Sequence, residues 1–177
     1  MLLDRCMSEY HSREVHSIRV ERPPAQLFPI VRHLDFSSSF ITKTLFALRG
    51  LSTKAMNLDA MVSAPGPFRI IAESDDELVV AGIGRPGGDL VTFETESEFE
   101  AMQAPGLIKI CWNFSLHQDN ENPGSTIVRT ETRIQSTDRK ARLIFFFYWL
   151  FVRPFSGLIR LEMLRIVRQT ALADDSR

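Results

Sequence analysis

Hydrophobic and polar residues alternate with a period of two along several segments of the chain, a pattern typical of β-strands with one buried face. In the first of these segments, residues 15–22, His16, Ile18 and Val20 lie on one side. Five later segments bounded by turn residues are also predicted to be strands: 68–73, 78–84, 90–102, 107–117 and 125–135. Because the links between them are short, we expect an antiparallel meander.

Helical patterns flank these strands. Pro23 and Pro24 end the first strand, and two helices are predicted at residues 25–34 and 40–49. Residues 51–67 fit either a short strand or an irregular loop. After residue 138 one long helical segment continues to about residue 172, and Pro154 lies within it. Helical periodicity resumes beyond Pro154, so we expect this residue to bend the helix rather than end it.

One face of the predicted sheet is apolar and has to be covered. It carries Trp112 and Phe114 on one strand, and Thr130 and Thr132 on the next. The long C-terminal helix is the natural cover, which predicts an α+β domain. A hydroxyl on a dry face needs a hydrogen-bonding partner, so these two threonines are candidates for polar groups that line a ligand cavity.

The opposite face is expected to be wet and rich in charge. Glu131 lies between Arg129 and Arg133 on this side, and acidic residues recur at every second position of the predicted strand 90–102. Charges of opposite sign on neighbouring strands can pair. We therefore expect a solvated, ion-paired surface here.

The C-terminal helix begins with ten consecutive apolar residues, 143–152. A membrane-spanning helix needs about 20 such residues, and extending this run brings in Arg153, Arg160 and Glu162. One side of the helix is expected to face the sheet. The other side carries an apolar surface that needs a partner, formed by Phe147, Leu150, Phe151, Leu158 and Leu161. The two N-terminal helices, a second copy of the chain or a bilayer surface could cover it. We expect a second copy, as a homodimer, with peripheral membrane contact as the next alternative.

Length and composition indicate a single globular domain. The chain has 177 residues, of which 44% are hydrophobic, and a net charge of −1, so no nucleic-acid partner is expected. Cys6 and Cys111 have no metal-binding spacing, and charged residues interrupt the N-terminus where a signal peptide would be apolar. We expect a flexible leader at 1–14, one domain at 15–173 and a cytoplasmic location.

The segment 130–171 resembles the C-terminal part of the START-like superfamily of polyketide cyclases/dehydrases and lipid-transport proteins. The similarity is carried by the Thr-Glu-Thr-Arg strand 130–133, Tyr148-Trp149, Arg153-Pro154 and the Ser-Gly-Leu-Ile-Arg stretch 156–160. It is closest to uncharacterised bacterial members. The resemblance implies a helix-grip fold, in which an antiparallel sheet wraps around a long C-terminal helix and encloses an apolar cavity.

Few residues point to catalysis. The sequence from Gly82 to Gly87 matches GxGxxG, but a strand rather than a helix follows it, so we interpret it as a hairpin turn. The four histidines have no metal-binding spacing, and no Ser lies in a GxSxG turn. We expect no metal, cofactor or catalytic group, although a cyclase or dehydratase acting on a polyketide-like substrate through a cavity acid or Tyr148 is the alternative.

The resulting hypothesis is non-catalytic binding of a small hydrophobic or amphipathic ligand, lipid or polyketide-like, in an internal cavity. Arg153 and Arg160 lie at the edge of the helix side that faces the sheet, where they would suit a carboxylate or phosphate on the ligand. The expected lining residues are Phe93, Trp112, Phe114, Thr130, Thr132, Tyr148, Trp149 and Arg153.

Overall fold

In the computed structural model, residues 1–37, 39–48, 56–63, 68–86 and 90–173 are described. The strands are β1 (Ser12–Val20), β2 (Phe68–Glu73), β3 (Glu77–Gly84), β4 (Leu90–Val91), β5 (Ile108–Gln118) and β6 (Thr126–Ser136). The helices are α1 (Leu2–Cys6), α2 (Pro24–Arg32), α3 (Phe40–Leu48), α4 (Leu58–Val62), α5 (Glu96–Ala101) and α6 (Arg139–Ala173).

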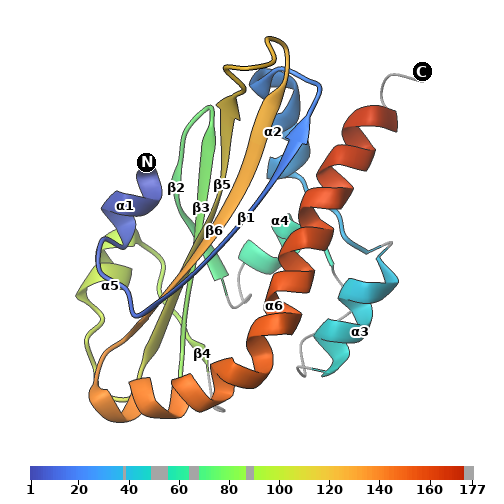
Figure 1. Ribbon diagram of the computed structural model, residues 1–177. Helices are drawn as coiled ribbons and strands as arrows, with labels where there is room; N and C mark the ends of the chain where they lie inside the picture. The colour runs from blue at the N-terminus through green and yellow to red at the C-terminus, as the bar shows by residue number, and fades with distance from the viewer. Residues whose placement is uncertain (38, 49–55, 64–67, 87–89, 174–177) are drawn as a thin grey trace.

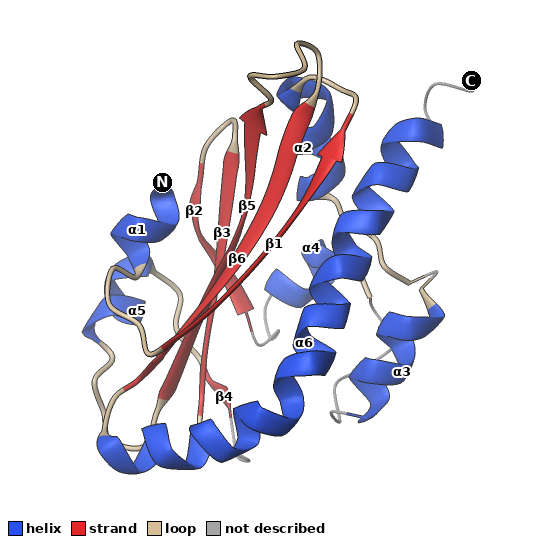
Figure 2. Cartoon of the chain, in the orientation of Figure 1, coloured by secondary structure: helices blue, strands red, loops and turns tan. Residues whose placement is uncertain are grey.

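The strands form one six-stranded antiparallel sheet in the order β1-β6-β5-β3-β2, with β4 paired to β3. Helices α2, α4 and α6 lie on one side of the sheet, the inner face, whereas α1 and α5 lie on the other side, the outer face (Figures 1 and 2). The long C-terminal helix thus packs across an antiparallel sheet. This is the helix-grip arrangement of the α+β class, as predicted.

Helix α6 is continuous across Pro154, which confirms that this residue does not end it. Its N-terminal part crosses the lower end of the sheet in Figure 1, and the helix then bends and rises beside the strands. Asp138 begins the helix, because its side chain accepts a hydrogen bond from the Ala141 amide at 2.7 Å. Proline lacks the amide hydrogen that a regular helix needs and crowds the preceding turn, which accounts for a bend in this region.

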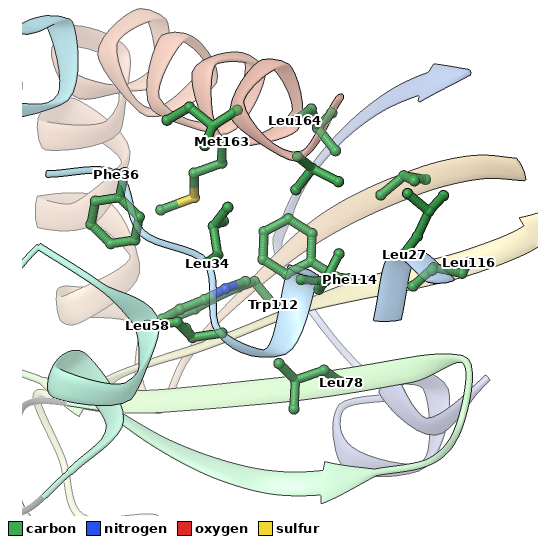
Figure 3. Close-up of a cluster of buried hydrophobic side chains, with 14 of the residues drawn as sticks. Leu27, Leu34, Phe36, Leu58, Leu78, Trp112, Phe114, Leu116, Met163 and Leu164 are labelled. Carbon is green, nitrogen blue, oxygen red and sulfur yellow. The ribbon is translucent and has the colours of Figure 1, made fainter. Parts of the chain in front are cut away.

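The inner face is packed with side chains from several elements. Trp112 and Phe114 of β5 are 2% and 0% exposed, and they belong to one cluster with Leu34, Phe36 and Met163 (Figure 3). Phe68 of β2 meets the Trp112 ring edge-on, with 4.7 Å between ring centroids. The predicted apolar face is confirmed, and the segment after α2 fills much of the space between the sheet and the C-terminal half of α6.

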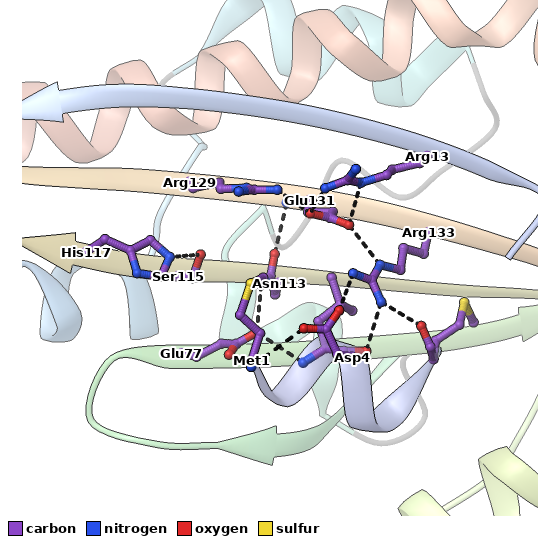
Figure 4. Close-up of polar contacts among 12 residues, drawn as sticks. Met1, Asp4, Arg13, Glu77, Asn113, Ser115, His117, Arg129, Glu131 and Arg133 are labelled. Carbon is purple, nitrogen blue, oxygen red and sulfur yellow. Dashed lines mark hydrogen bonds and ion pairs between the residues drawn. The ribbon is translucent and has the colours of Figure 1, made fainter. Parts of the chain in front are cut away.

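The outer face is charged, as predicted, but its part around Glu131 is buried rather than solvated. Glu131 has no exposed surface, and its carboxylate accepts hydrogen bonds from Arg13 (2.7 and 2.9 Å), Arg129 (2.6 Å) and Arg133 (2.8 Å; Figure 4). Arg133 continues to Asp4 of α1 at 2.6 Å. Helix α1 therefore covers charges that the strand pattern alone assigned to solvent.

The N-terminal segment is attached to this face, in contrast to the flexible leader that we predicted. Leu3 and Cys6 are buried, and the Glu77 carboxylate accepts hydrogen bonds from the amides of Leu2 (2.6 Å) and Leu3 (3.1 Å) at the start of α1. Strand β1 also begins earlier than predicted, at Ser12. Polar residues at the first positions of β1 hid the start of the strand from the hydrophobic pattern.

The predicted strand 90–102 is wrong beyond Val91, because residues 96–101 form helix α5. The Thr95 side chain accepts a hydrogen bond from the Glu98 amide at 3.2 Å, and the Glu98 carboxylate accepts one from the Glu94 amide at 2.7 Å. The Thr-x-x-Glu spacing is that of a capping box, which starts a helix, although Glu98 here accepts from the amide of the residue before the cap. Two of the acidic residues that we placed on a strand, Glu96 and Glu98, lie instead in the first turn of α5, where negative charge is favourable.

The buried carboxylate predicts a specific loss of stability in acid. Burial favours the protonated form, but the hydrogen bonds from Arg13, Arg133 and Arg129 outweigh it and lower the pKa of Glu131 from 4.5 to about 2. A carboxyl group with a lowered folded-state pKa stabilises the protein above its unfolded pKa, and this contribution is lost as the pH falls from about 4.5 through about 2.

We expect Glu131→Gln to lower the free energy of unfolding at neutral pH by up to about 3 kcal/mol, because it removes a fully buried carboxylate that pairs with buried Arg133 and with the partly exposed Arg13 and Arg129. The difference from wild type should shrink in acid, as measured by urea denaturation. Glu121→Gln, at an 86% exposed side chain, is the matched control and should change little. An effect of Glu131→Gln that does not depend on pH would contradict this account.

Candidate functional site

A groove of about 720 Å³ opens between the N-terminal part of α6 and the adjoining ends of β1 and β6. Its lining residues come from the segment before and into β1, from the end of β6 and from the first half of α6: His11, Ser12, Arg13, Ile134, Ser136, Arg139, Arg142, Leu143, Phe145, Phe146, Trp149 and Arg153. Such a volume suits a drug-sized molecule. This open groove at the end of the sheet is not the internal apolar cavity that we predicted over Trp112 and Phe114, because those two side chains are packed in the main hydrophobic cluster.

The groove is strongly cationic. Arg13 is paired with Glu131, whereas Arg139, Arg142 and Arg153 form no ion pair or side-chain hydrogen bond within the described residues. None of the described lining residues is Asp or Glu. Three guanidinium groups without a counter-charge favour a carboxylate or phosphate, with which arginine forms paired hydrogen bonds.

Burial and the positive charge of the groove both affect the protonation of His11. Its Nδ1 accepts a hydrogen bond from the Ser136 amide at 3.0 Å, which requires a ring that is not protonated at that nitrogen. Burial, and then the positive charge of Arg142, lower the pKa of His11 below its usual value. The imidazole therefore favours its neutral form beside the arginines.

An apolar surface formed by Phe145 and Trp149 adjoins the cationic side chains. The rings of Phe145 and Trp149 stack with 5.6 Å between centroids, and Phe145 packs with Ile134 of β6. Phe145 is buried and Trp149 half-buried. The groove thus combines an aromatic surface with positive charge, which matches a molecule that is apolar at one end and anionic at the other.

Further along the same sheet face lies a group of buried and partly buried polar side chains. Glu14 of β1 is aligned with Thr132 and Trp112, and His16 is aligned with Thr130 and Phe114. Oε1 of Glu14 lies 3.2 Å from Nε2 of His16, within ion-pair distance but without hydrogen-bond geometry. We call these two sets the polar rows. Along the strands, the row of Glu14 lies two residues from Ser12 of the groove, and the row of His16 lies four residues from it. Two residues of a strand span roughly 7 Å.

Several atoms of this polar group have no hydrogen-bonding partner within the structure described. They are Oε2 of Glu14, Nε2 of His16, Nε1 of Trp112 and Oγ1 of Thr130. Buried polar atoms are normally satisfied, so a concentration of exceptions on one face indicates a place where a polar molecule or ordered water binds.

Helix α6 passes very close to this group. A Cβ atom at Gly157 would meet Oε1 of Glu14 at 2.8 Å, so glycine allows the helix backbone to approach the pair. The guanidinium of Arg160 lies 4.6 Å above the Trp112 ring as a cation–π contact. Arg160 therefore covers the Trp112 side of the polar group, in place of the position at the cavity mouth that we predicted for it.

The predicted lining residues separate into several places. Trp149 and Arg153 line the groove, and Trp112, Thr130 and Thr132 belong to the buried polar rows. Phe114 is enclosed in the main hydrophobic cluster. Tyr148 is 41% exposed beside Phe145, with 5.7 Å between the rings.

Phe93 does not belong with the other predicted lining residues. It packs against Phe99 of α5, in the separate cluster on the outer face. The error follows from the missed helix, because a strand through residue 93 would have pointed this ring toward the inner face.

Sequence analysis missed two parts of this site. Glu14 lies outside the predicted strand, although its position two residues before His16 would place it on the inner face of a longer strand. Arg139 and Arg142 share a helix flank with Trp149 and Arg153, which the 3.6-residue period could have indicated. Because His, Ser and Arg are polar, these lining residues produce no hydrophobic periodicity, and the sequence pattern did not indicate them.

A second pocket, of about 530 Å³, lies on the outer face and has side chains of both charges, including Arg5, Asp76 and Glu77. Among the described residues, no three His, Cys, Asp or Glu side chains are grouped so that they could hold a metal ion. Within the described part of the chain, the groove and the adjoining polar rows are the main candidate sites for a ligand.

The partnerless Thr130 hydroxyl allows a direct test of the polar rows. Thr130→Val removes no hydrogen bond in this structure, so we expect the free energy of unfolding to stay unchanged or rise by up to about 1 kcal/mol. In contrast, Thr126→Val loses a 2.6 Å bond to the Arg22 carbonyl and should lower it by about 1 kcal/mol. A comparable loss in both variants, measured by chemical denaturation, would mean that Thr130 is satisfied in solution.

No protein-family model and no curated protein matches the chain. Similar solved structures include TTHA0849 from Thermus thermophilus, 10% identical with a TM-score of 0.33, over 92% of this chain and 99% of that one. Another is Ara h 8.0201, 8% identical with a TM-score of 0.34, over 92% of this chain and 98% of that one. Similarity at this level carries no argument about function, and the fold assignment rests on the topology of the chain itself.

Proposed function

We propose that this protein binds a small amphipathic ligand, lipid or polyketide-like, whose carboxylate or phosphate group contacts Arg139, Arg142 and Arg153. The apolar part of the ligand would lie on Phe145 and Trp149. The observation that carries the proposal is the groove of about 720 Å³ with three arginines that have no counter-charge among the described residues. Like charges held close together repel one another, and a bound anion relieves that repulsion.

The resemblance of residues 130–171 to the START-like superfamily agrees with this proposal, because that group includes carriers of apolar molecules. The proposed location is the cytoplasm. Binding without chemistry is the simpler proposal for the groove itself, since among its described lining residues His11 is the only titratable side chain besides arginine.

The test is a titration with soluble single-chain amphiphiles that differ only in their head group. We expect dodecanoate to bind saturably below its micelle concentration, and dodecanol and dodecylammonium to bind at least about tenfold more weakly, since a charge-assisted hydrogen bond contributes about 1.5–3 kcal/mol. Arg153→Gln should weaken the binding of dodecanoate by a similar factor. Arg168→Gln, an exposed residue of the same helix outside the groove, is the matched control.

His11 offers an independent readout. Burial is the main cause of the lowered pKa of His11, and the positive charge of Arg142 is the second. A carboxylate near Arg142 would offset that charge, so the pKa should be higher with dodecanoate bound than with uncharged dodecanol bound. This can be followed by NMR titration of the imidazole. Equal affinity for dodecanol and dodecanoate, or a His11 pKa that is no higher at saturation with dodecanoate than with dodecanol, would rule out binding of the head group in this groove.

Glu14 and His16 support a second candidate function, a cyclase or dehydratase acting on a polyketide-like substrate. The sequence analysis found no inward-facing acid, but Glu14 is 11% exposed on the inner face, next to a histidine that is 19% exposed. A carboxylate and an imidazole within 3.2 Å of each other can accept and donate a proton.

For this alternative, Glu14→Gln should lower the rate of cyclisation or dehydration of a poly-β-keto thioester by about 10²–10⁴-fold. The rate would be followed by mass spectrometry of the products. Glu9→Gln, at an exposed residue just before β1, is the control and should keep the full rate. If wild type does not accelerate the reaction, the enzymatic alternative is wrong, and the ligand-binding proposal is unaffected.

A further inference from the structure

The N-terminal part of α6 exposes an unusual amount of apolar side chain. Leu143, Phe147, Leu150 and Phe151 are 60%, 56%, 63% and 72% exposed. They are spaced at i, i+4, i+7 and i+8, and so they lie on one side of the helix. We call these four residues the α6 apolar face.

This face belongs to a helix that is apolar enough to enter a membrane. Helix α6 has 35 residues and contains an 18-residue window of mean hydropathy 1.4, of which 22% is buried in the structure. By length and composition alone it could cross a bilayer. However, Ile159, Met163 and Val167 of its C-terminal half are buried against the sheet side, so about half of the helix is committed to the protein core.

Charge distinguishes between the possible partners of the α6 apolar face. Helix α6 carries seven Arg or Lys residues and a single acidic residue, Glu162. Glu162 accepts a hydrogen bond from Ser39 at 3.0 Å, away from the N-terminal part of the helix. Two copies of such a helix face to face would bring like charges together, whereas an anionic surface would be attracted.

The placement of the cations also fits a bilayer surface. By helical period, Arg142 and Arg153 lie between buried Phe145 and exposed Leu150, on the flank of the apolar face. Arginines on the flank of an apolar helix face extend to lipid head groups while aromatic and leucine side chains enter the acyl boundary. This is the distribution of an interfacial helix that lies in the plane of the membrane.

From these observations we infer that the α6 apolar face docks on the surface of a bilayer that contains anionic lipid. The helix lies parallel to the surface, with the C-terminal half still packed on the sheet. The sequence alone favoured a second copy of the chain as the partner. The excess of positive charge along α6 is the reason for preferring a membrane. This inference does not depend on the ligand proposed for the groove.

Vesicle flotation tests the inference with the full chain. We expect wild type to float with phosphatidylcholine vesicles that contain phosphatidylserine, and to bind pure phosphatidylcholine vesicles at least about tenfold more weakly. Added salt should release the protein. Phe147→Ser combined with Phe151→Ser should lower binding by about tenfold or more, because two exposed aromatic side chains no longer enter the bilayer.

A matched control replaces two exposed apolar side chains elsewhere. Val15→Ser combined with Leu172→Ser, at residues 40% and 49% exposed, should leave vesicle binding unchanged. Circular dichroism verifies that both double variants are folded, and all groove arginines are retained. The dodecanoate titration of the Phe147→Ser, Phe151→Ser variant should match wild type, which separates membrane docking from ligand binding.

Three outcomes would overturn the inference. The first is equal flotation with and without phosphatidylserine, or none at all. The second is a wild-type dimer in light scattering that Phe147→Ser and Phe151→Ser convert to a monomer, which would assign the face to a second copy. The third is binding that resists both high salt and alkaline carbonate, which would indicate insertion of α6 across the bilayer.

Discussion

The packing of the C-terminal half of α6 on the inner face of the sheet is the contact on which the rest of the structure depends. It buries Ile159, Met163 and Val167, and the absence of a side chain at Gly157 brings the helix backbone next to Glu14. Because this half is held in place, the residues before Pro154 have to continue beyond the core and cross the end of the sheet (Figure 1). The groove and the exposed apolar face are both consequences of that geometry.

The two faces of the sheet handle charge in different ways. On the outer face, three arginines pair with Glu131, and one of them, Arg133, also donates a hydrogen bond to Asp4 of α1. The two buried charges of this network, Glu131 and Arg133, each have a counter-charge, which compensates for their burial in a low-dielectric interior. At the groove, Arg139, Arg142 and Arg153 are left without a counter-charge among the described residues. Arginine therefore stabilises the fold on the outer face, whereas the arginines of the groove remain without a counter-charge in the described part of the chain and could contact a ligand.

The two proposed surfaces are adjacent along α6. The groove lies on the flank that carries Arg142, Trp149 and Arg153, and the apolar face begins at the next positions around the helix. An amphipathic ligand and a bilayer have the same two chemical parts, an acyl region and an anionic head group. A helix that presents aromatic side chains beside arginines can contact both, and this common chemistry is why the proposed tests separate soluble amphiphiles from vesicles.

Local sequence determined most of the architecture. Strict alternation placed Trp112, Phe114, Thr130 and Thr132 on one face, because a strand points successive side chains to opposite sides. The long apolar run predicted α6, and its periodicity beyond Pro154 correctly predicted that the helix continues. The local pattern was insufficient where a capping interaction competed with alternation, as in α5, whose Thr95–Glu98 box starts a helix in a segment that alternates like a strand.

Tertiary structure alone decided which charges are buried and which arginines are unpaired. Nothing in the sequence near Glu131 shows that α1, more than a hundred residues earlier in the chain, covers it. The juxtaposition of His11, Arg142 and Arg153 likewise depends on where α6 crosses the end of β1. Hydrophobic periodicity shows which side of a helix or strand is buried. The pairing of charges depends on distances between elements that are remote in sequence, and only the folded chain sets those distances.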